Sequence, residues 1–358
     1  MTRNYSKFLL PNQSAVPQSR PVSTIESLGW QPYFAQQTSV DEIEQHPPAR
    51  VVEVHRNGLH IVGNDVDALL PPNADATVGD WVMYDAAQPS LSRVLERKSL
   101  VKRRAPGTDR QVQLIAANID TGFIVTSCNQ DFNVARLERY IALAFEADIT
   151  PVIVLTKTDL SDSVQAYVDQ ARAISELVDV VAMDARADEP ASKLSHWCKR
   201  GKTVAFLGSS GVGKSTLTNA LAGSQSIETQ AMRTDDAKGR HTTTRRQLHV
   251  VPSGCVVLDT PGMRELQMTD AASGIGDLFA DLHDLAGQCK FNDCRHLTEP
   301  GCAVLKAVES GDVDDARMRR WQKLVAEEAF NSATLAERRS KDKSFGKMVR
   351  TIQKRNKK

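Results

Sequence analysis

The sequence of 358 residues predicts a multidomain α/β protein with a small N-terminal β-barrel, a central domain built on a parallel sheet, and a C-terminal helical domain. Three patterns predict this organisation. Short alternating strands fill residues 49–102, apolar strands alternate with helices over residues 118–223, and a Cys/His cluster precedes a charged helical segment. At roughly 100–200 residues per domain, the length allows two or three domains.

The N-terminal part is expected to hold a mobile arm over residues 1–35, which are polar and rich in proline, and a barrel over residues 36–105. Residues 50–55 alternate, Asn57-Gly58 predicts a hairpin turn, and the alternation resumes at Leu59. Because a lone sheet would leave exposed edges, several short strands in sequence favour a closed barrel. We interpret it as an OB-like fold.

The central domain is expected over residues 106–272. Residues 121–126, 151–156 and 179–183 form apolar strands, and residues 134–147 place apolar side chains on one helical face. Continuous apolar strands that alternate with helices are typical of a parallel sheet covered on both faces.

A complete P-loop motif, G-x-x-x-x-G-K-S, lies between a strand and a helix of this domain, as phosphate binding requires. Its glycines allow backbone N–H groups to face phosphate oxygens. We expect Lys214 to reach the β- and γ-phosphates and Ser215 to bind Mg²⁺. The predicted nucleotide-binding residues of this segment are Gly208, Ser209, Ser210, Gly211, Val212, Gly213, Lys214, Ser215 and Thr216.

A D-x-x-G motif, Asp259-Thr-Pro-Gly262, follows an apolar strand downstream of the P-loop. An aspartate at this place can hold Mg²⁺, and the N–H of Gly262 can reach the γ-phosphate. The motif alone also fits an ordinary Pro-Gly turn, but its position favours the nucleotide role.

Guanine selection is predicted by Thr156-Lys-Thr-Asp159, which is close to N-K-x-D, with Thr156 in place of the usual Asn. The Asp159 carboxylate can accept hydrogen bonds from guanine N1–H and the exocyclic amine, and leaving such a buried group unpaired costs ~1–3 kcal/mol. Lys157 can lay its methylenes on the base. After the next strand, the Ala185 N–H can meet the guanine oxygen, although Asp184 replaces the more usual Ser. A plain strand-to-helix turn is the alternative for Thr156–Asp159.

A metal site is predicted by Cys289-x₄-Cys294-x-His296-x₅-Cys302. Three thiolates and one imidazole form a closed tetrahedral zinc site of the structural type. Clustered Cys in a reducing compartment indicate metal before disulfide. We expect one structural Zn²⁺ in a domain over residues 273–337.

The charge distribution and the hydropathy of the sequence indicate which classes of partner the protein can bind. Residues 338–358 form a basic tail with a net charge of +9, against −8 for the rest of the chain. Such a tail favours a nucleic-acid partner, and a solubilising extension is the alternative. No apolar run approaches the ~20 residues that cross a bilayer. No secretory leader is recognisable, so we expect a cytoplasmic protein without a membrane partner.

The order of the motifs is reversed, because an ordinary GTPase has its P-loop before its base-reading motifs. A parallel sheet with surface ends tolerates such circular permutation. With Gly239-Arg-His-Thr-Thr-Thr244 and the zinc motif, the chain resembles the circularly permuted RsgA/YjeQ GTPases over about residues 36–330. The resemblance implies a bacterial GTPase that acts late in maturation of the small ribosomal subunit, binds its rRNA and helps to release an assembly factor.

The resemblance also implies that Thr243 or Thr244 closes on Mg²⁺ and the γ-phosphate. Met263 stands where Ras-like proteins place a water-orienting Gln, so unassisted hydrolysis is expected to be slow. His241 is the nearest candidate to position water, and an exposed or RNA-contacting loop residue is the equal alternative.

Two functions fit these patterns. The first is a monomeric GTPase that converts GTP to GDP and phosphate with Mg²⁺ and is stimulated by the small subunit. The second is a GTP-gated RNA-binding checkpoint in which turnover is incidental, an alternative that Met263 supports. A P-loop nucleotide kinase is disfavoured by Asp159 and the switch motifs.

Overall fold

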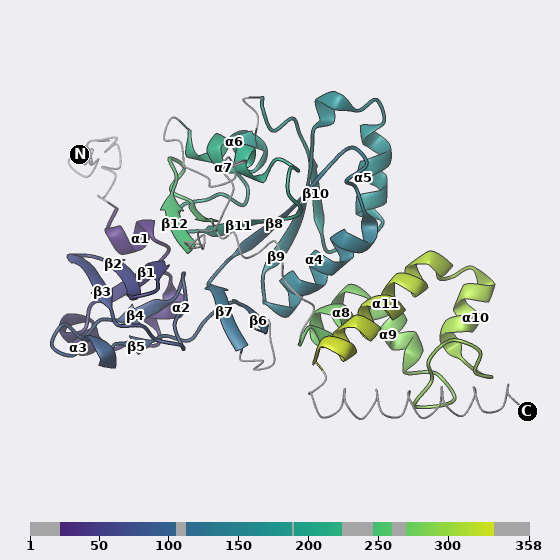
Figure 1. Ribbon diagram of the computed structural model, residues 1–358, viewed down its shortest axis with the longest axis horizontal. Helices are drawn as coiled ribbons and strands as arrows, with labels where there is room; N and C mark the ends of the chain where they lie inside the picture. The colour runs from purple at the N-terminus through teal and green to yellow at the C-terminus, as the bar shows by residue number, and fades with distance from the viewer. Residues whose placement is uncertain (1–21, 105–111, 188–189, 224–245, 260–269, 333–358) are drawn as a thin grey trace, which may run out of the picture.

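The computed structural model describes residues 22–104, 112–187, 190–223, 246–259 and 270–332. Figure 1 shows an N-terminal β region, a central sheet flanked by helices, and a separate group of helices toward the C-terminus. This mixed α/β architecture confirms the predicted fold class. Within the described segments, no helix combines the length and apolar character needed to cross a membrane.

Three short helices precede the β region: α1 (Thr24–Ser27), α2 (Pro32–Ala35) and α3 (Val40–Gln45). Phe34 is 1% exposed, and the Trp30 ring packs edge-on against Trp81 with a centroid distance of 4.9 Å. The expectation of a mobile arm over residues 1–35 is therefore wrong for residues 22–35, because Phe34 is buried and the partly buried Trp30 packs against a strand of the β region. Residues 1–21 lie outside the described part.

The N-terminal β region has five strands, β1 (Pro48–His55), β2 (Gly58–Gly63), β3 (Val66–Leu70), β4 (Trp81–Met83) and β5 (Arg93–Val94), with a 3-10 turn at Pro89–Leu91. All pairs are antiparallel in the order β3-β2-β1-β4-β5. This order agrees with an OB-like Greek-key barrel that is partly open, since no ladder among the described strands joins β5 to β3.

A hairpin links the β region to the central domain. Strand β6 (Leu100–Arg104) pairs antiparallel with β7 (Val112–Ala117), across the boundary expected at residue 105.

The central sheet has five parallel strands in the order β10-β9-β8-β11-β13. These strands are β8 (Thr121–Ser127), β9 (Thr150–Thr156), β10 (Asp179–Ala182), β11 (Thr203–Leu207) and β13 (Val256–Asp259). Strand β12 (Arg246–Val250), which the sequence analysis missed, pairs antiparallel with both β13 and β1. The β region and the central domain therefore share one continuous sheet.

Helices cover both faces of the parallel sheet, as the apolar strands predict (Figure 1). They are α4 (Val134–Glu146), α5 (Val164–Arg172), α6 (Pro190–Lys193) and α7 (Lys214–Ala222), with a 3-10 turn at Thr158–Leu160. Alternate residues of β8 enter different cores: Ile124 packs with the core that includes α4 and α5, whereas Phe123 packs with the core that includes α7.

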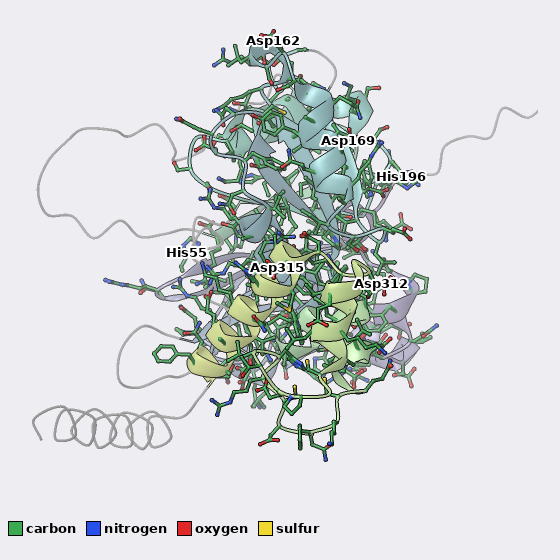
Figure 2. All side chains as sticks on the ribbon, turned by 90° about the vertical axis from the view of Figure 1, so that its right-hand side faces the viewer. His55, Asp162, Asp169, His196, Asp312 and Asp315 are labelled. Atoms are coloured by element: carbon green, nitrogen blue, oxygen red, sulfur yellow. The ribbon has the colours of Figure 1, made fainter. Side chains whose placement is uncertain are left out.

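The C-terminal part is helical, with α8 (Ala272–Leu278), α9 (Ala280–Ala286), α10 (Ala303–Ser310) and α11 (Asp315–Ser332). Figure 2 views the molecule from this side, with Asp315 at the start of α11 and Asp312 in the loop before it. Helix α11 is tied to α4 by ion pairs. The Arg320 Nε–H is shared between the two carboxylate oxygens of the fully buried Glu138, each at 2.9 Å, and Arg139 pairs with Glu327.

Candidate nucleotide-binding site and metal centre

The P-loop follows β11 and leads into α7, as its sequence predicts. Gly208 has φ 134°, and a Cβ atom there would lie 2.2 Å from the carbonyl oxygen of Val125, so only glycine fits beside β8. Gly213 precedes α7 with φ 99°. The Lys214 ammonium folds back over the loop and donates hydrogen bonds to the carbonyls of Gly208, at 2.9 Å, and Ser209. The loop therefore wraps around its own lysine at a helix N-terminus, the geometry that suits a phosphate group.

Thr156 joins the base-reading motif to the P-loop. Its fully buried hydroxyl is 2.6 Å from the Val212 carbonyl and 3.2 Å from the Thr126 carbonyl. A hydroxyl carries one hydrogen, so it satisfies these two acceptors in turn rather than together. The structure thus gives Thr156, which replaces the usual Asn, a direct contact with the phosphate-binding loop.

Lys157 adopts a left-handed backbone conformation with φ 56° and ψ 38°. A non-glycine residue held in this region costs on the order of 1 kcal/mol, and such strain gathers at functional sites. The following 3-10 turn carries Asp159, which is exposed at the carboxyl end of β9.

The second base-reading loop follows β10. The Asp184 carboxylate accepts a hydrogen bond of 2.8 Å from the Arg186 N–H and so fixes the turn around the buried Ala185. The hydroxyl oxygen of the more usual Ser can accept the same hydrogen bond, which explains why Asp184 is compatible with the loop.

These three segments surround one cavity of about 280 Å³. Its lining includes the base-reading residues Thr156, Lys157, Asp159, Asp184, Ala185 and Arg186, and the P-loop residues Gly211, Gly213 and Thr216. Because parallel strands end at the same sheet edge, motifs that are dozens of residues apart in the chain meet here. Asn129, just beyond β8, also lines the cavity and was not singled out from the sequence. Its place at the carboxyl end of a parallel strand was the available signal.

The switch residues are only partly described. Asp259 is the last residue of β13, beside the strand that leads into the P-loop. Gly262, His241, Thr243 and Thr244 lie outside the described residues. Their predicted contacts with Mg²⁺, phosphate and water remain predictions.

The metal centre brings together the four predicted ligands, Cys289, Cys294, His296 and Cys302, whose ligand atoms all lie within 4.8 Å of one another. The Sγ atoms of Cys289 and Cys302 are 3.8 Å apart, and His296 Nδ1 is 3.6 Å from the first and 3.4 Å from the second. A tetrahedral zinc ion with bonds of about 2.3 Å to sulfur and about 2.0 Å to nitrogen requires separations of roughly 3.8 Å between two sulfur atoms and roughly 3.5 Å between sulfur and nitrogen. The cluster therefore has the shape and donor set for Zn²⁺.

The surroundings of the cluster favour the ligand forms. Burial lowers the pKa of His296, which keeps its imidazole neutral and able to bind a metal. Gln322 of α11 donates a hydrogen bond of 2.9 Å to the His296 carbonyl. The Glu299 carboxylate accepts hydrogen bonds from three loop N–H groups, which lower its pKa to about 2. These contacts hold the loop that carries the imidazole.

Comparisons with known proteins agree with this architecture. The family model of the RsgA GTPase matches residues 94–269. An ABC transporter model matches residues 191–351, a range that contains the P-loop, the element such ATPases also carry. A crystal structure of YjeQ from Thermotoga maritima aligns with a TM-score of 0.58 at 26% identity, over 78% of this chain and 97% of that one. A structure of YloQ, described as a circularly permuted GTPase, shares the fold with a TM-score of 0.53 at 24% identity, over 83% of this chain and 99% of that one.

Two relatives of similar length are much closer in sequence. The small ribosomal subunit biogenesis GTPase RsgA 2 of Vibrio parahaemolyticus is 48% identical over 92% of each chain. The small ribosomal subunit biogenesis GTPase RsgA of Mesorhizobium japonicum is also 48% identical, over 90% of this chain and 94% of that one. Fold and site define the class, a P-loop GTPase with circularly permuted motifs. The chain belongs to the RsgA GTPase family.

Proposed function

We propose that this protein is a GTP hydrolase that acts in late maturation of the small ribosomal subunit. The observation that carries the proposal is the single cavity lined by Asp159, Ala185 and the P-loop glycines. The cavity joins a carboxylate that can read the base to a loop that can hold phosphates, and this combination suits a guanine nucleotide. The base would lie at Asp159 and the phosphates at the N-terminus of α7.

The chemistry at the phosphates follows from the P-loop template. Lys214 and the loop amides stabilise the β- and γ-phosphates, while Ser215, Asp259 and one of Thr243 and Thr244 hold Mg²⁺. The Gly262 N–H contacts the γ-phosphate, and His241 positions the attacking water. Met263 cannot orient water, so we expect hydrolysis to be slow until the subunit stimulates it.

The four-ligand cluster binds one structural Zn²⁺ in this proposal. A closed set of three thiolates and one imidazole leaves no position for substrate, so the metal stabilises the loop between α9 and α10. Since the ligands are brought together by folding, the binding free energy of the ion contributes to the stability of this part of the chain.

The ribosomal role rests on the relatives, which are named for biogenesis of the small subunit. We propose that the OB-like domain (36–105) and the zinc domain (273–337) bind rRNA on either side of the GTPase domain (106–272). The basic tail (338–358) adds salt-sensitive affinity for phosphates, and GTP hydrolysis promotes release of an assembly factor. A monomer in the cytoplasm is the expected working form.

A GTP-gated RNA-binding checkpoint is the second candidate, because Met263 replaces the water-orienting Gln. Multiple-turnover GTP hydrolysis, measured with and without purified small subunits, separates the two. Stimulation by subunits supports the enzyme, with Lys214→Ala as the inactive control. GTP-dependent subunit binding without turnover would favour the checkpoint.

A further inference from the structure

A cation from a distant part of the chain lies against the P-loop. Arg136 is in the first turn of α4, where the Asn133 side chain accepts a hydrogen bond of 3.0 Å from the Arg136 N–H and caps the helix. The Arg136 guanidinium donates a hydrogen bond of 2.7 Å to the Ser209 hydroxyl. The helix start is thus fixed at the point from which this side chain reaches the phosphate-binding loop.

Ser209 belongs to the phosphate end of the site. Its carbonyl accepts a hydrogen bond from Lys214, the cation that reaches the β- and γ-phosphates in P-loop proteins. The base-reading residues contact the other end of the loop, since Thr156 hydrogen-bonds the Val212 carbonyl. Arg136 therefore stands beside the part of the cradle that handles the terminal phosphates.

The charge of Arg136 is available to a ligand. The side chain is exposed, and among the described residues no carboxylate forms an ion pair with it. A guanidinium has five N–H donors, so the bond to Ser209 leaves others for an oxyanion. Helix α4 is itself held by the Glu138–Arg320 and Arg139–Glu327 pairs, which makes it a firm support.

We propose that Arg136 is a positioning residue for the γ-phosphate: it holds Ser209 in place and adds positive charge at the terminal-phosphate end of the cradle. GTP carries more negative charge at this end than GDP, so Arg136 favours the triphosphate. This inference rests on the proposed GTP site. Arg136 lies outside the P-loop, D-x-x-G and base-reading motifs described above, and the inference comes from its contact with the P-loop residue Ser209.

The test measures dissociation constants for GDP and for a non-hydrolysable GTP analogue, by titration of the full-length protein. Arg136→Ala is expected to weaken binding of the analogue about fivefold to tenfold, as for loss of a charge-assisted contact. Binding of GDP should weaken less than about twofold. Arg136→Lys keeps the positive charge but loses the planar guanidinium, so its affinity for the analogue should lie between those of the parent and Arg136→Ala. The control is Arg172→Ala, which removes an exposed arginine from the last turn of α5 that does not line the cavity.

A double-mutant cycle with Ser209→Ala tests the contact itself, since the two substitutions should be non-additive for the analogue. The proposal would be overturned if Arg136→Ala weakened the binding of GDP and of the analogue equally, or changed neither affinity. Circular dichroism checks that each variant is folded. If Arg136→Ala does not fold, the affinities of Arg136→Lys for GDP and the analogue are compared with those of the parent instead. A parent protein that binds neither nucleotide would instead refute the proposed GTP site.

Discussion

Gly274 offers a sharp test of how the C-terminal helices sit on the GTPase domain. A Cβ atom at this position of α8 would lie 2.0 Å from the Ala142 carbonyl oxygen and 2.7 Å from the Glu146 nitrogen. Both atoms belong to the backbone of α4, so neither can turn aside. Gly276, two residues further along α8, has no atom within 4 Å of the same point.

The two glycines predict opposite effects of the same substitution. Alanine is intrinsically better than glycine in a helix interior by about 1 kcal/mol. At Gly276 this gain is unopposed, so Gly276→Ala should raise the free energy of unfolding by up to about 1 kcal/mol. At Gly274 an overpacking cost of about 3 kcal/mol, near the top of the usual range because backbone must move, outweighs the gain. Gly274→Ala should therefore lower the free energy of unfolding by about 2 kcal/mol.

Urea unfolding of both variants and the parent measures this difference, with the slope m compared before midpoints are interpreted. Amide hydrogen exchange of α4 and α8 then locates the change, because separate domains need not unfold together. If Gly274→Ala is as stable as Gly276→Ala, the close contact between the two helices is not present in solution.

Three further predictions follow from the zinc cluster, the switch and the tail. Cys294→Ala should lower the zinc content below about one ion per chain and destabilise the C-terminal helices, and zinc-free protein with these helices intact would contradict the structural role. His241→Ala should mainly reduce subunit-stimulated GTP hydrolysis, whereas an unchanged rate would leave His241 as a plain loop residue. Removing residues 338–358 should weaken subunit co-sedimentation and flatten its salt dependence, and identical salt slopes would show that the tail only aids solubility.

The fold was predictable where local pattern and motif agreed. The 3.6-residue apolar periodicity of residues 134–147 became α4, and the strands that carry Thr156 and the P-loop had no polar interruptions. Strand β12 was missed because its sequence, Arg246-Gln-Leu-His-Val250, is mostly polar, and one of its partners, β1, comes from a distant part of the chain. Its pairing is a tertiary property that no local window contains.

The site was predictable where a residue belongs to a chemical motif, as the cavity lining by Asp159 and Ala185 illustrates. Residues that act through contacts across the fold carry no such signal. Arg136 reads in the sequence as one more charge on a helix, and its contact with Ser209 spans 73 positions. Trp30 and Phe34 were likewise hidden within a polar, proline-rich segment, because burial against Trp81 depends on the distant strand.

The central claim is that motifs in permuted order build one guanine-nucleotide site, and nucleotide selectivity of Asp159→Asn tests it most directly. The amide loses the charged acceptor for guanine N1–H and the exocyclic amine, and it gains a donor for the C2 oxygen of xanthine. Titration with GTP and XTP should show GTP binding at least about tenfold weaker than in the parent, with XTP binding improved, since a hydrogen bond to a charged group contributes about 1.5–3 kcal/mol. Unchanged GTP affinity and no gain for XTP would contradict the claim.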